Sequence, residues 1–204
     1  KNAFLYGELD KHIYMEQPPG YISKTHPDFV CKLKKALYGL KQAPRAWYGK
    51  IAEYLHFCGY LASHSDSSLF IKNSGDLHMV VLLYVDDMIV TGNDEKEVAN
   101  LRVELSTRFE MKDLGELSNF LGLEVTSVMD GIFLTQEGYA KKLVDRFGMK
   151  SSKKCSTPLD ANAKIQSKEG SLLLDPRTFR ALVGSLLYLT ISRPDTVFSV
   201  NFIS

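Results

Sequence analysis

The stretch that decides the fold is Leu77-His78-Met79-Val80-Val81-Leu82-Leu83-Tyr84-Val85-Asp86-Asp87-Met88-Ile89-Val90, where two adjacent acids separate a long apolar run from a shorter one. Apolar runs of this length, rich in Val, Leu and Ile, predict buried strands. Asp is uncommon within strands and suits the tight connection between them. The pattern therefore predicts a hairpin whose turn holds Asp86 and Asp87 at the end of a rigid sheet.

Two interpretations of this turn stand open on its residues alone. Carboxylates fixed at the end of a sheet form a hard-oxygen site suited to Mg²⁺, which needs one or two of them together with waters and substrate phosphates. An Asp-Asp pair is also ordinary in a hairpin turn that binds nothing. The choice between them depends on the rest of the chain.

The composition is that of an ordinary globular protein. The 204 residues are 45% hydrophobic and 24% charged, enough for one large domain or for one with a partial second. No apolar stretch reaches the roughly 20 residues that cross a bilayer, so we expect no membrane partner. Cys31, Cys58 and Cys155 are far apart, which favours buried thiols in a reducing compartment over disulfides or zinc. The chain lacks an initiator Met and a signal peptide, and we expect it to be a piece of a longer protein.

Basic residues gather in two segments, although the net charge is only +1. The segment from Cys31 to Lys50 has no acidic residue, the segment from Gly138 to Lys154 has only Asp145, and acidic residues concentrate between them. Basic segments around an acidic centre suit an enzyme that grips phosphates and holds metal ions. The alternative is that each segment is a solvated helix face. The basic residues are Lys32, Lys34, Lys35, Lys41, Arg45 and Lys50, then Lys141, Lys142, Arg146, Lys150, Lys153 and Lys154.

Apolar spacing and breaker residues predict the main elements. Helices are expected at about 44–58 after Pro44, at 94–109 with Asn93 or Asp94 as cap, at 136–147, from Asp175 to before Arg193, and from Val197. Strands are expected at 12–15, 29–33, 69–71, 119–126 and 131–135, with turns at 73–76 and around Met129-Asp130-Gly131. Residues 149–175 are expected to form a long connection. Trp47 is interpreted as a core anchor.

Several motifs of the chain match those of a known family in the same order. They are Lys1-Asn2-Ala3-Phe4-Leu5, Tyr14-Met15-Glu16-Gln17-Pro18-Pro19-Gly20, Lys35-Ala36-Leu37-Tyr38-Gly39-Leu40-Lys41-Gln42-Ala43-Pro44-Arg45-Ala46-Trp47, Tyr84-Val85-Asp86-Asp87, Met111-Lys112-Asp113-Leu114-Gly115-Glu116-Leu117, Phe120-Leu121-Gly122-Leu123-Glu124-Val125, Thr157-Pro158-Leu159, Leu182-Val183-Gly184-Ser185-Leu186-Leu187-Tyr188-Leu189 and Arg193-Pro194-Asp195. Nearly from end to end, the chain resembles the reverse transcriptase of copia-type LTR retrotransposons, which is encoded within a Pol polyprotein.

This resemblance implies an α+β fold of the right-hand polymerase type. Residues 1–125 would form the palm, an antiparallel sheet backed by helices, with part of the fingers. Residues 126–155 would form the thumb region, and 156–204 the truncated start of the connection region. The implied activity is that of an RNA-directed DNA polymerase, a nucleotidyltransferase that extends a primer 3′-hydroxyl with two Mg²⁺ ions, or with Mn²⁺.

The resemblance also implies partners and a location. The partners are an RNA or DNA template with its primer, dNTPs, and the RNase H, integrase and Gag particle of the parent polyprotein. The implied process in which these partners act is DNA integration and transposition. The implied location is a cytoplasmic virus-like particle, with nuclear entry of the replication complex.

Roles for single residues follow from the same resemblance. Asp86 and Asp87 would supply metal-site carboxylates, with Asp86 the more direct ligand, and Lys112 would donate a proton to pyrophosphate. Phe4 would block a ribonucleotide 2′-hydroxyl; its alternative is a plain core residue. Residues expected to bind the incoming nucleotide are Phe4, Tyr38, Gly39 and Tyr84. Residues expected to bind nucleic acid are Lys41, Arg45, Phe120, Leu121, Gly122, Lys141, Lys142 and Arg146. The alternatives for Tyr38 and Lys112 are a half-buried aromatic and a surface lysine.

The chain departs from the family pattern at its start. The family's other principal metal-binding Asp precedes Lys1 by two residues, in the pattern Asp-Val-Lys-Asn-Ala-Phe. None of Asp10, Asp66 and Asp76 stands in that sequence context. We therefore expect little or no primer extension from these residues alone. Three hypotheses remain: a polymerase, a non-catalytic remnant that at most binds nucleic acid, and another two-metal palm enzyme such as a cyclase.

Overall fold

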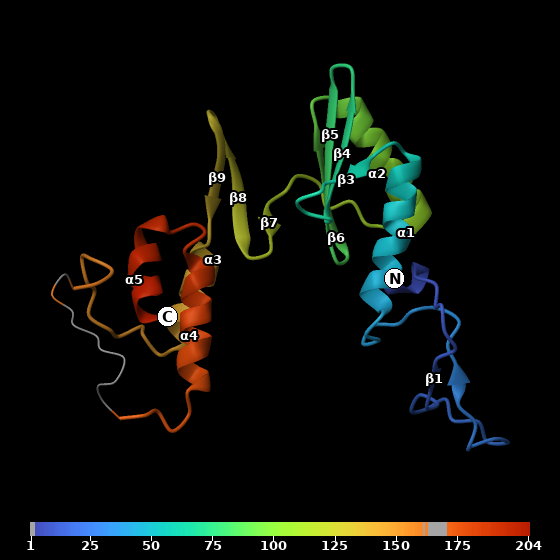
Figure 1. Ribbon diagram of the computed structural model, residues 1–204, viewed down its shortest axis with the longest axis horizontal. Coiled ribbons are helices and arrows are strands. Elements are labelled where there is room, and N and C mark those ends of the chain that lie inside the picture. The colour runs from blue at the N-terminus through green and yellow to red at the C-terminus, as the bar shows by residue number, and fades with distance from the viewer. Residues whose placement is uncertain (1–2, 161, 163–170) are drawn as a thin grey trace. The chain divides into compact units, whose positions relative to one another are not determined.

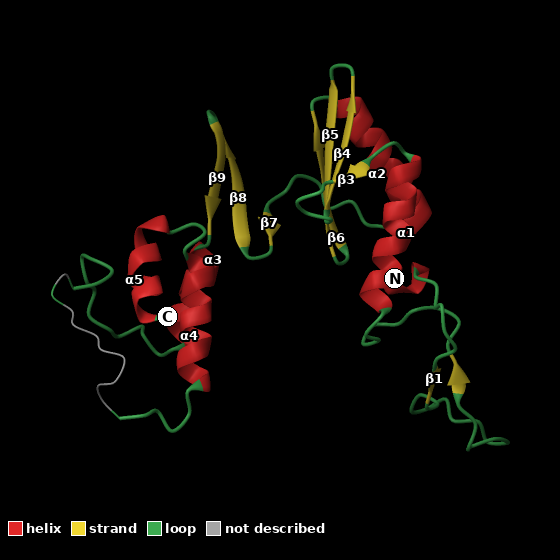
Figure 2. Ribbon diagram, in the orientation of Figure 1, coloured by secondary structure: helices red, strands yellow, loops and turns green. Residues whose placement is uncertain are grey.

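The computed structural model describes residues 3–160, 162 and 171–204 and has an α+β fold with antiparallel sheets (Figures 1 and 2). Lys1 and Asn2 of the first motif, and residues 161 and 163–170 of the expected long connection, lie outside the described residues. The chain divides into two compact units, Lys1–Gly115 and Glu116–Ser204. Within the described part, no helix is long and apolar enough to cross a membrane.

The first unit is organised around an antiparallel sheet with the strand order β3-β4-β5-β6. Its strands are β3 (Leu61–Ala62), β4 (Leu69–Ser74), β5 (Leu77–Tyr84) and β6 (Asp87–Gly92). The predicted acidic hairpin is present, but Tyr84 pairs with Asp87, so the loop is Val85-Asp86. The prediction that Asp87 lies in the turn is therefore wrong by one position. The loop has two residues because such loops match the twist of the paired strands.

Helices α1 (Ala43–Phe57) and α2 (Glu95–Phe109) pack on this sheet, as their apolar spacing predicts. Pro44 stands in the first turn of α1, where a missing N–H costs nothing. The chain leaves α1 through Gly59, whose φ of +87° is a conformation that glycine adopts readily. Asp94 caps α2 by accepting hydrogen bonds from the backbone N–H groups of Lys96 and Glu97.

Among the described residues of this unit, the helices cover only one face of β5. Met79, Val81 and Leu83 are buried against α1 and α2, whereas Tyr84 is exposed and Leu82 is half-buried. The prediction of a buried strand is therefore right for one face alone. Both helices cover the same face, so successive side chains alternate between core and open surface.

The residues before α1 form short elements. These are the 3₁₀ helix η1 (Ala3–Tyr6) and the paired strands β1 (Tyr14–Met15) and β2 (Cys31–Lys32). Just after η1, a side chain at Gly7 would lie 2.8 Å from the Cβ of Ala46. This contact requires a glycine, and the backbone N–H of Ala36 also donates to the Gly7 carbonyl at 3.0 Å. The first contact places the end of η1 against the start of α1, and the second ties it to the segment before α1.

The second unit combines a three-stranded sheet with helices. Its elements are β7 (Asn119–Phe120), β8 (Leu123–Val128), β9 (Gly131–Thr135), α3 (Glu137–Arg146), α4 (Arg177–Leu189), η2 (Pro194–Thr196) and α5 (Val197–Ile203). The strand predicted at 119–126 is wrong, because the chain turns at Leu121 and Gly122, with φ of +51° and +83°. Two successive positive φ values make the tight turn that joins β7 to β8.

Polar contacts connect the helices of this unit to its sheet. The side chain of Glu124 on β8 accepts a hydrogen bond of 2.7 Å from the backbone N–H of Gly138 and so caps α3. The buried side chain of Gln136 accepts from the Ser192 hydroxyl at 2.7 Å and donates to the Tyr188 carbonyl at 3.3 Å. These bonds hold the start of α3 beside the end of α4.

The close approach of β5 and β6 gives a test of the first unit. The Cβ of alanine at position 92 would lie 2.8 Å from the backbone oxygen of His78. We expect Gly92→Ala to lower the free energy of unfolding by ~1–3 kcal/mol, because the sheet must shift to admit the methyl group. Urea unfolding followed by fluorescence of Trp47, the single tryptophan, measures it.

Gly49→Ala is the matched control. It lies within α1, and a Cβ there would meet nothing within 4 Å. We expect it to raise the free energy of unfolding by ~0.5–1 kcal/mol through helix propensity. Equal effects of the two substitutions would contradict the packing described for Gly92.

Candidate active site

Asp86 and Asp87 lie next to each other at an exposed end of the β5–β6 hairpin. Asp86 is the second residue of the loop, and Asp87 begins β6 opposite Tyr84. Neither carboxylate makes a hydrogen bond or ion pair with another of the described residues. Asp66 and Asp113, by contrast, each accept hydrogen bonds from nearby residues, which hold their pKa values below the usual range. The hairpin therefore presents two adjacent acids that are available to a ligand.

The loop that carries these acids has an unusual backbone. Val85 has a φ of +52°, in the left-handed region that β-branched residues rarely adopt. Its carbonyl oxygen accepts a hydrogen bond of 2.6 Å from Nε1 of Trp47. Trp47 is buried, which confirms its interpretation as a core anchor. The polar contact was missed, although a buried indole N–H generally requires an acceptor.

The residues expected near the nucleotide base and sugar do come together. The ring centroid of Phe4 lies 5.7 Å from that of Tyr38, and Gly39 follows with a φ of +95°. Phe4 is buried, as its alternative role as a core residue requires. Tyr38 is 82% exposed, which excludes the half-buried alternative. An exposed aromatic ring supported by a buried one is a surface on which a base can stack.

The other candidate residues of the first unit are exposed. Lys41 precedes α1, Arg45 lies in its first turn, and Lys112 follows the end of α2. Beside Lys112, Asp113 forms an ion pair with Arg102 on α2. This pair anchors the segment that carries Lys112.

In the second unit, Leu121 and Gly122 form the exposed turn between β7 and β8, and Phe120 is half-buried. The hydroxyl of Tyr188 donates to the Leu121 carbonyl and so holds this turn against α4. The residues of this turn that are expected to bind nucleic acid therefore lie on a hairpin that α4 holds in place.

The three basic candidates on α3 are not equivalent. Lys141 forms an ion pair of 2.6 Å with Glu137, and this contact raises the pKa of Lys141 and lowers that of Glu137. Lys142 and Arg146 are exposed one helical turn apart, and Arg146 lies 5.4 Å from the ring of Phe147. Lys142 and Arg146 are therefore the better placed pair for a phosphate backbone.

Ion pairs also occupy other lysines of the two basic segments. Lys35 lies 3.6 Å from Glu8, Lys50 lies 3.1 Å from Glu53, and Lys150 lies 3.0 Å from Asp145. Each of these lysines is therefore paired with an acid at the surface.

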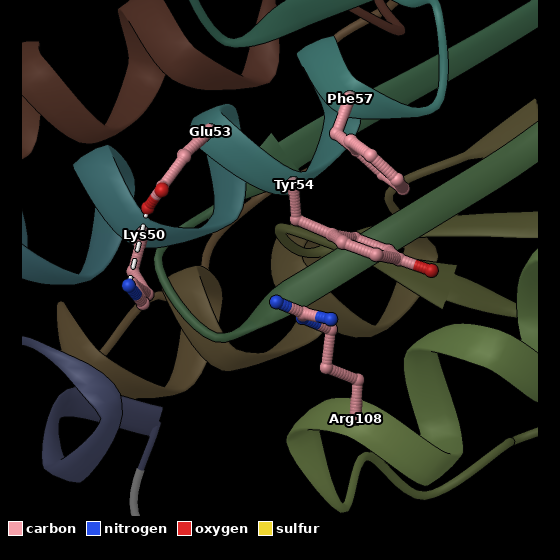
Figure 3. Close-up of a pocket in the computed structure, with 5 residues that line it drawn as sticks. All are labelled: Lys50, Glu53, Tyr54, Phe57 and Arg108. Atoms are coloured by element: carbon pink, nitrogen blue, oxygen red, sulfur yellow. Dashed lines mark hydrogen bonds and ion pairs between the residues drawn. The ribbon is translucent and has the colours of Figure 1, made fainter.

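A hollow between α1 and α2 has a different chemistry. It is lined by Lys50, Glu53, Tyr54, Phe57 and Arg108, and Figure 3 shows the Arg108 guanidinium facing the Tyr54 ring. The guanidinium carbon lies 4.6 Å from the ring centroid, and Lys50 pairs with Glu53. Burial and a hydrogen bond to Glu104 raise the pKa of Tyr54, so its hydroxyl stays protonated. The contacts of Tyr54 with Arg108 and Glu104 join α1 to α2.

Asp86 and Asp87 fit the ligand requirements of a divalent cation in part. Mg²⁺ binds through one or two carboxylates when waters and substrate phosphates complete its shell. The described residues contain no group of three or more His, Cys, Asp or Glu side chains that could hold a metal. The pair can therefore supply two carboxylates to a centre that substrate and further ligands complete.

Comparison with known proteins places these features in a family. A family model described as reverse transcriptase (RNA-dependent DNA polymerase) matches residues 1–161. The chain is 46% identical over 203 residues to the retrovirus-related Pol polyprotein from transposon RE1 of Arabidopsis thaliana, covering 100% of this chain and 14% of that protein. It is 38% identical over 216 residues to the corresponding polyprotein from transposon TNT 1-94 of Nicotiana tabacum, covering 100% and 16%.

A shorter relative comes from yeast. The chain is 31% identical over 204 residues to the putative transposon Ty5-1 protein of Saccharomyces cerevisiae, covering 99% of this chain and 66% of that protein. No solved structure gives a significant match. The chain thus spans about one seventh of the RE1 polyprotein.

Cation binding at the hairpin is testable with Mn²⁺. The chain has one tryptophan and so one indole N–H resonance, and this group contacts Val85 beside the acids. We expect Mn²⁺ to broaden this resonance, because a paramagnetic ion at Asp86 and Asp87 would be close to it. NMR spectra recorded during a Mn²⁺ titration measure the effect.

Asp86→Asn and Asp87→Asn together should abolish the broadening. The control is Asp76→Asn, which changes an acid in the loop at the other end of β5. Equal broadening in the double variant and the unchanged chain would contradict a cation site at the hairpin.

Proposed function

The chain belongs to the reverse transcriptase (RNA-dependent DNA polymerase) family, and from this premise we propose that it is the polymerase segment of a retrotransposon Pol polyprotein. In that setting it extends the 3′-hydroxyl of a primer along an RNA or DNA template. The observation that carries the proposal is the exposed pair Asp86 and Asp87, held at a defined hairpin end, whose carboxylates make no hydrogen bond or ion pair with other described residues.

Asp86 and Asp87 would hold the divalent ions of the reaction, with Asp86 the more direct ligand. Two bound Mg²⁺ ions, or Mn²⁺ ions, would activate the attacking hydroxyl and stabilise the charge of the leaving pyrophosphate. The chain contributes orientation: a two-residue loop on a paired strand fixes the backbone that carries both carboxylates. We propose that further ligands complete this centre in the polyprotein, and that the isolated 204 residues extend primers weakly or not at all.

The incoming nucleotide would lie against Tyr38 and Gly39, with Tyr84 beside the acids. Phe4 supports this proposal because its ring lies against that of Tyr38. At that place the Phe4 ring would lie below the sugar, and its bulk would exclude a ribonucleotide 2′-hydroxyl. Lys112 would protonate the departing pyrophosphate. Its exposure leaves the ammonium group accessible to a phosphate.

Primer and template would be held through their phosphates, without reading sequence. In the first unit Lys41 and Arg45 would serve at the start of α1, where backbone N–H groups also favour phosphate. In the second unit the turn at Leu121 and Gly122 would support the primer end, and Lys142 with Arg146 would contact the backbone. We assign the palm with partial fingers to 1–125, the thumb to 126–155 and the connection to 156–204.

The remaining proposals concern the whole polyprotein. RNase H, integrase and a Gag particle would act with this segment, in a cytoplasmic virus-like particle from which the replication complex enters the nucleus. For the isolated chain, a second candidate function is binding of nucleic acid without catalysis. The exposed Lys142 and Arg146 favour it, because phosphate binding requires no metal site.

The first test is Asp86→Asn in the polyprotein that contains this chain. We expect primer extension to fall by at least about 100-fold, since a ligand of the reactive centre is lost. Binding of a primer–template duplex, measured by fluorescence anisotropy, should stay unchanged. Asp76→Asn is the control, with activity retained. Extension that survives Asp86→Asn would overturn the assignment of the metal ligand.

The second test concerns the phosphate contacts of α3. We expect Lys142→Ala with Arg146→Ala to reduce the slope of log affinity against log salt by ~1 per residue. Lys150→Ala removes a lysine already paired with Asp145 and should change the slope little. The measurement is duplex affinity over a range of salt concentrations. An unchanged slope in the double variant would exclude these two contacts.

A further inference from the structure

The loop between β5 and β6 adopts a conformation that its own residues disfavour. Val85 is β-branched and has a φ of +52° at the first loop position, where glycine is the usual residue. Such a residue in the left-handed region is strained and persists only when its surroundings enforce it. A contact outside the loop must therefore stabilise this conformation.

That contact is the hydrogen bond from Nε1 of Trp47 to the Val85 carbonyl, at 2.6 Å. The carbonyl belongs to the peptide plane whose N–H is that of Asp86. Rotation of this plane would break the bond and leave a buried indole N–H without an acceptor. The bond thus fixes the peptide that leads into the first of the two acids.

Trp47 is itself held by aromatic rings from two other elements. The ring centroid of Phe109, at the end of α2, lies 5.4 Å from that of Trp47 in an edge-to-face arrangement. Tyr6 of η1 lies 6.0 Å away, and Tyr6 and Phe109 contact each other at 5.5 Å. Since Phe4 also belongs to η1, the same cluster connects the acidic loop to the proposed nucleotide surface.

We infer that Trp47 is a positioning residue of the polymerase centre, which directs Asp86 and Asp87 by holding the carbonyl of Val85. The inference rests on the proposed function for its catalytic consequence. Trp47 touches no substrate in this assignment. Its loss should lower kcat and weaken metal binding, while KM for dNTP and duplex affinity stay near their original values.

The experiment removes the indole N–H and keeps the ring. In the polyprotein, Trp47 is replaced by 3-benzothienylalanine, in which sulfur stands in place of the N–H, and by Trp47→Phe. We expect kcat to fall about tenfold in the benzothienyl variant, equivalent to ~1.4 kcal/mol. The Mg²⁺ concentration for half-maximal activity should rise, and Tm should stay close to that of the unchanged protein.

Two variants separate positioning from stability. Tyr54→Phe removes another hydrogen bond of the same core, 2.9 Å from the hydroxyl to Glu104, and should lower Tm without changing kcat. Val85→Gly relieves the backbone conformation, so the loss of kcat caused by Trp47→Phe should be smaller in that background. Rescue of this kind is not expected of a purely structural tryptophan.

A readout without catalysis keeps the inference separate from the proposed function. Binding of Mn²⁺ to the 204-residue chain, followed by the EPR signal of the free ion, should weaken several-fold in the benzothienyl variant. If the unchanged polyprotein shows no extension, the proposed function fails and Mn²⁺ affinity still decides on Trp47. The inference would be overturned if kcat and Mn²⁺ affinity were unchanged in the benzothienyl variant. It would also be overturned if kcat fell only in proportion to Tm, as judged from Tyr54→Phe.

Discussion

The register of the β5–β6 hairpin is the constraint on which the candidate site depends. Tyr84 pairs with Asp87 across a loop of two residues. Because side chains alternate along a strand, burial of Met79, Val81 and Leu83 against the helices sends Tyr84 to the open side. A slip of one residue would expose the core side chains. The apolar core of the first unit therefore determines where Asp87 lies.

Local signals in the sequence predicted the helices well and the loop less well. Pro44, Gly59 and Asp94 each act through their own backbone or side chain, so their effects can be predicted without the fold. The conformation of the loop at Val85 could not be predicted in this way. It opposes the preference of a β-branched residue and depends on Trp47, which is distant in the chain. Apolar spacing alone missed the turn at Leu121 although Gly122 follows it, since the apolar run around it favours a continuous strand.

Charge patterns overestimated the surface available to phosphates. The basic segments contain lysines that pair with acids close in sequence, such as Lys141 with Glu137, and one that pairs with a distant acid, Lys35 with Glu8. A count of charges cannot separate these from Lys142 and Arg146, because pairing depends on which helix face each residue occupies. Motif resemblance grouped Phe4 with Tyr38, which are far apart in sequence and have neighbouring rings in the structure; their roles at a nucleotide stay a prediction.

The groups that hold the acidic hairpin are neutral, and this separates folding from ligand binding at the site. The backbone ladder of β5 and β6, the indole of Trp47 and the apolar core fix the loop without using either carboxylate. Elsewhere in the described chain, acids such as Asp94 and Glu124 cap helices and so contribute to the fold. Two exposed like charges side by side repel each other, and a bound cation relieves that repulsion. Because the loop is already in place, the protein needs little reorganisation when a cation binds. Catalysis through metal ions requires such a preorganised site.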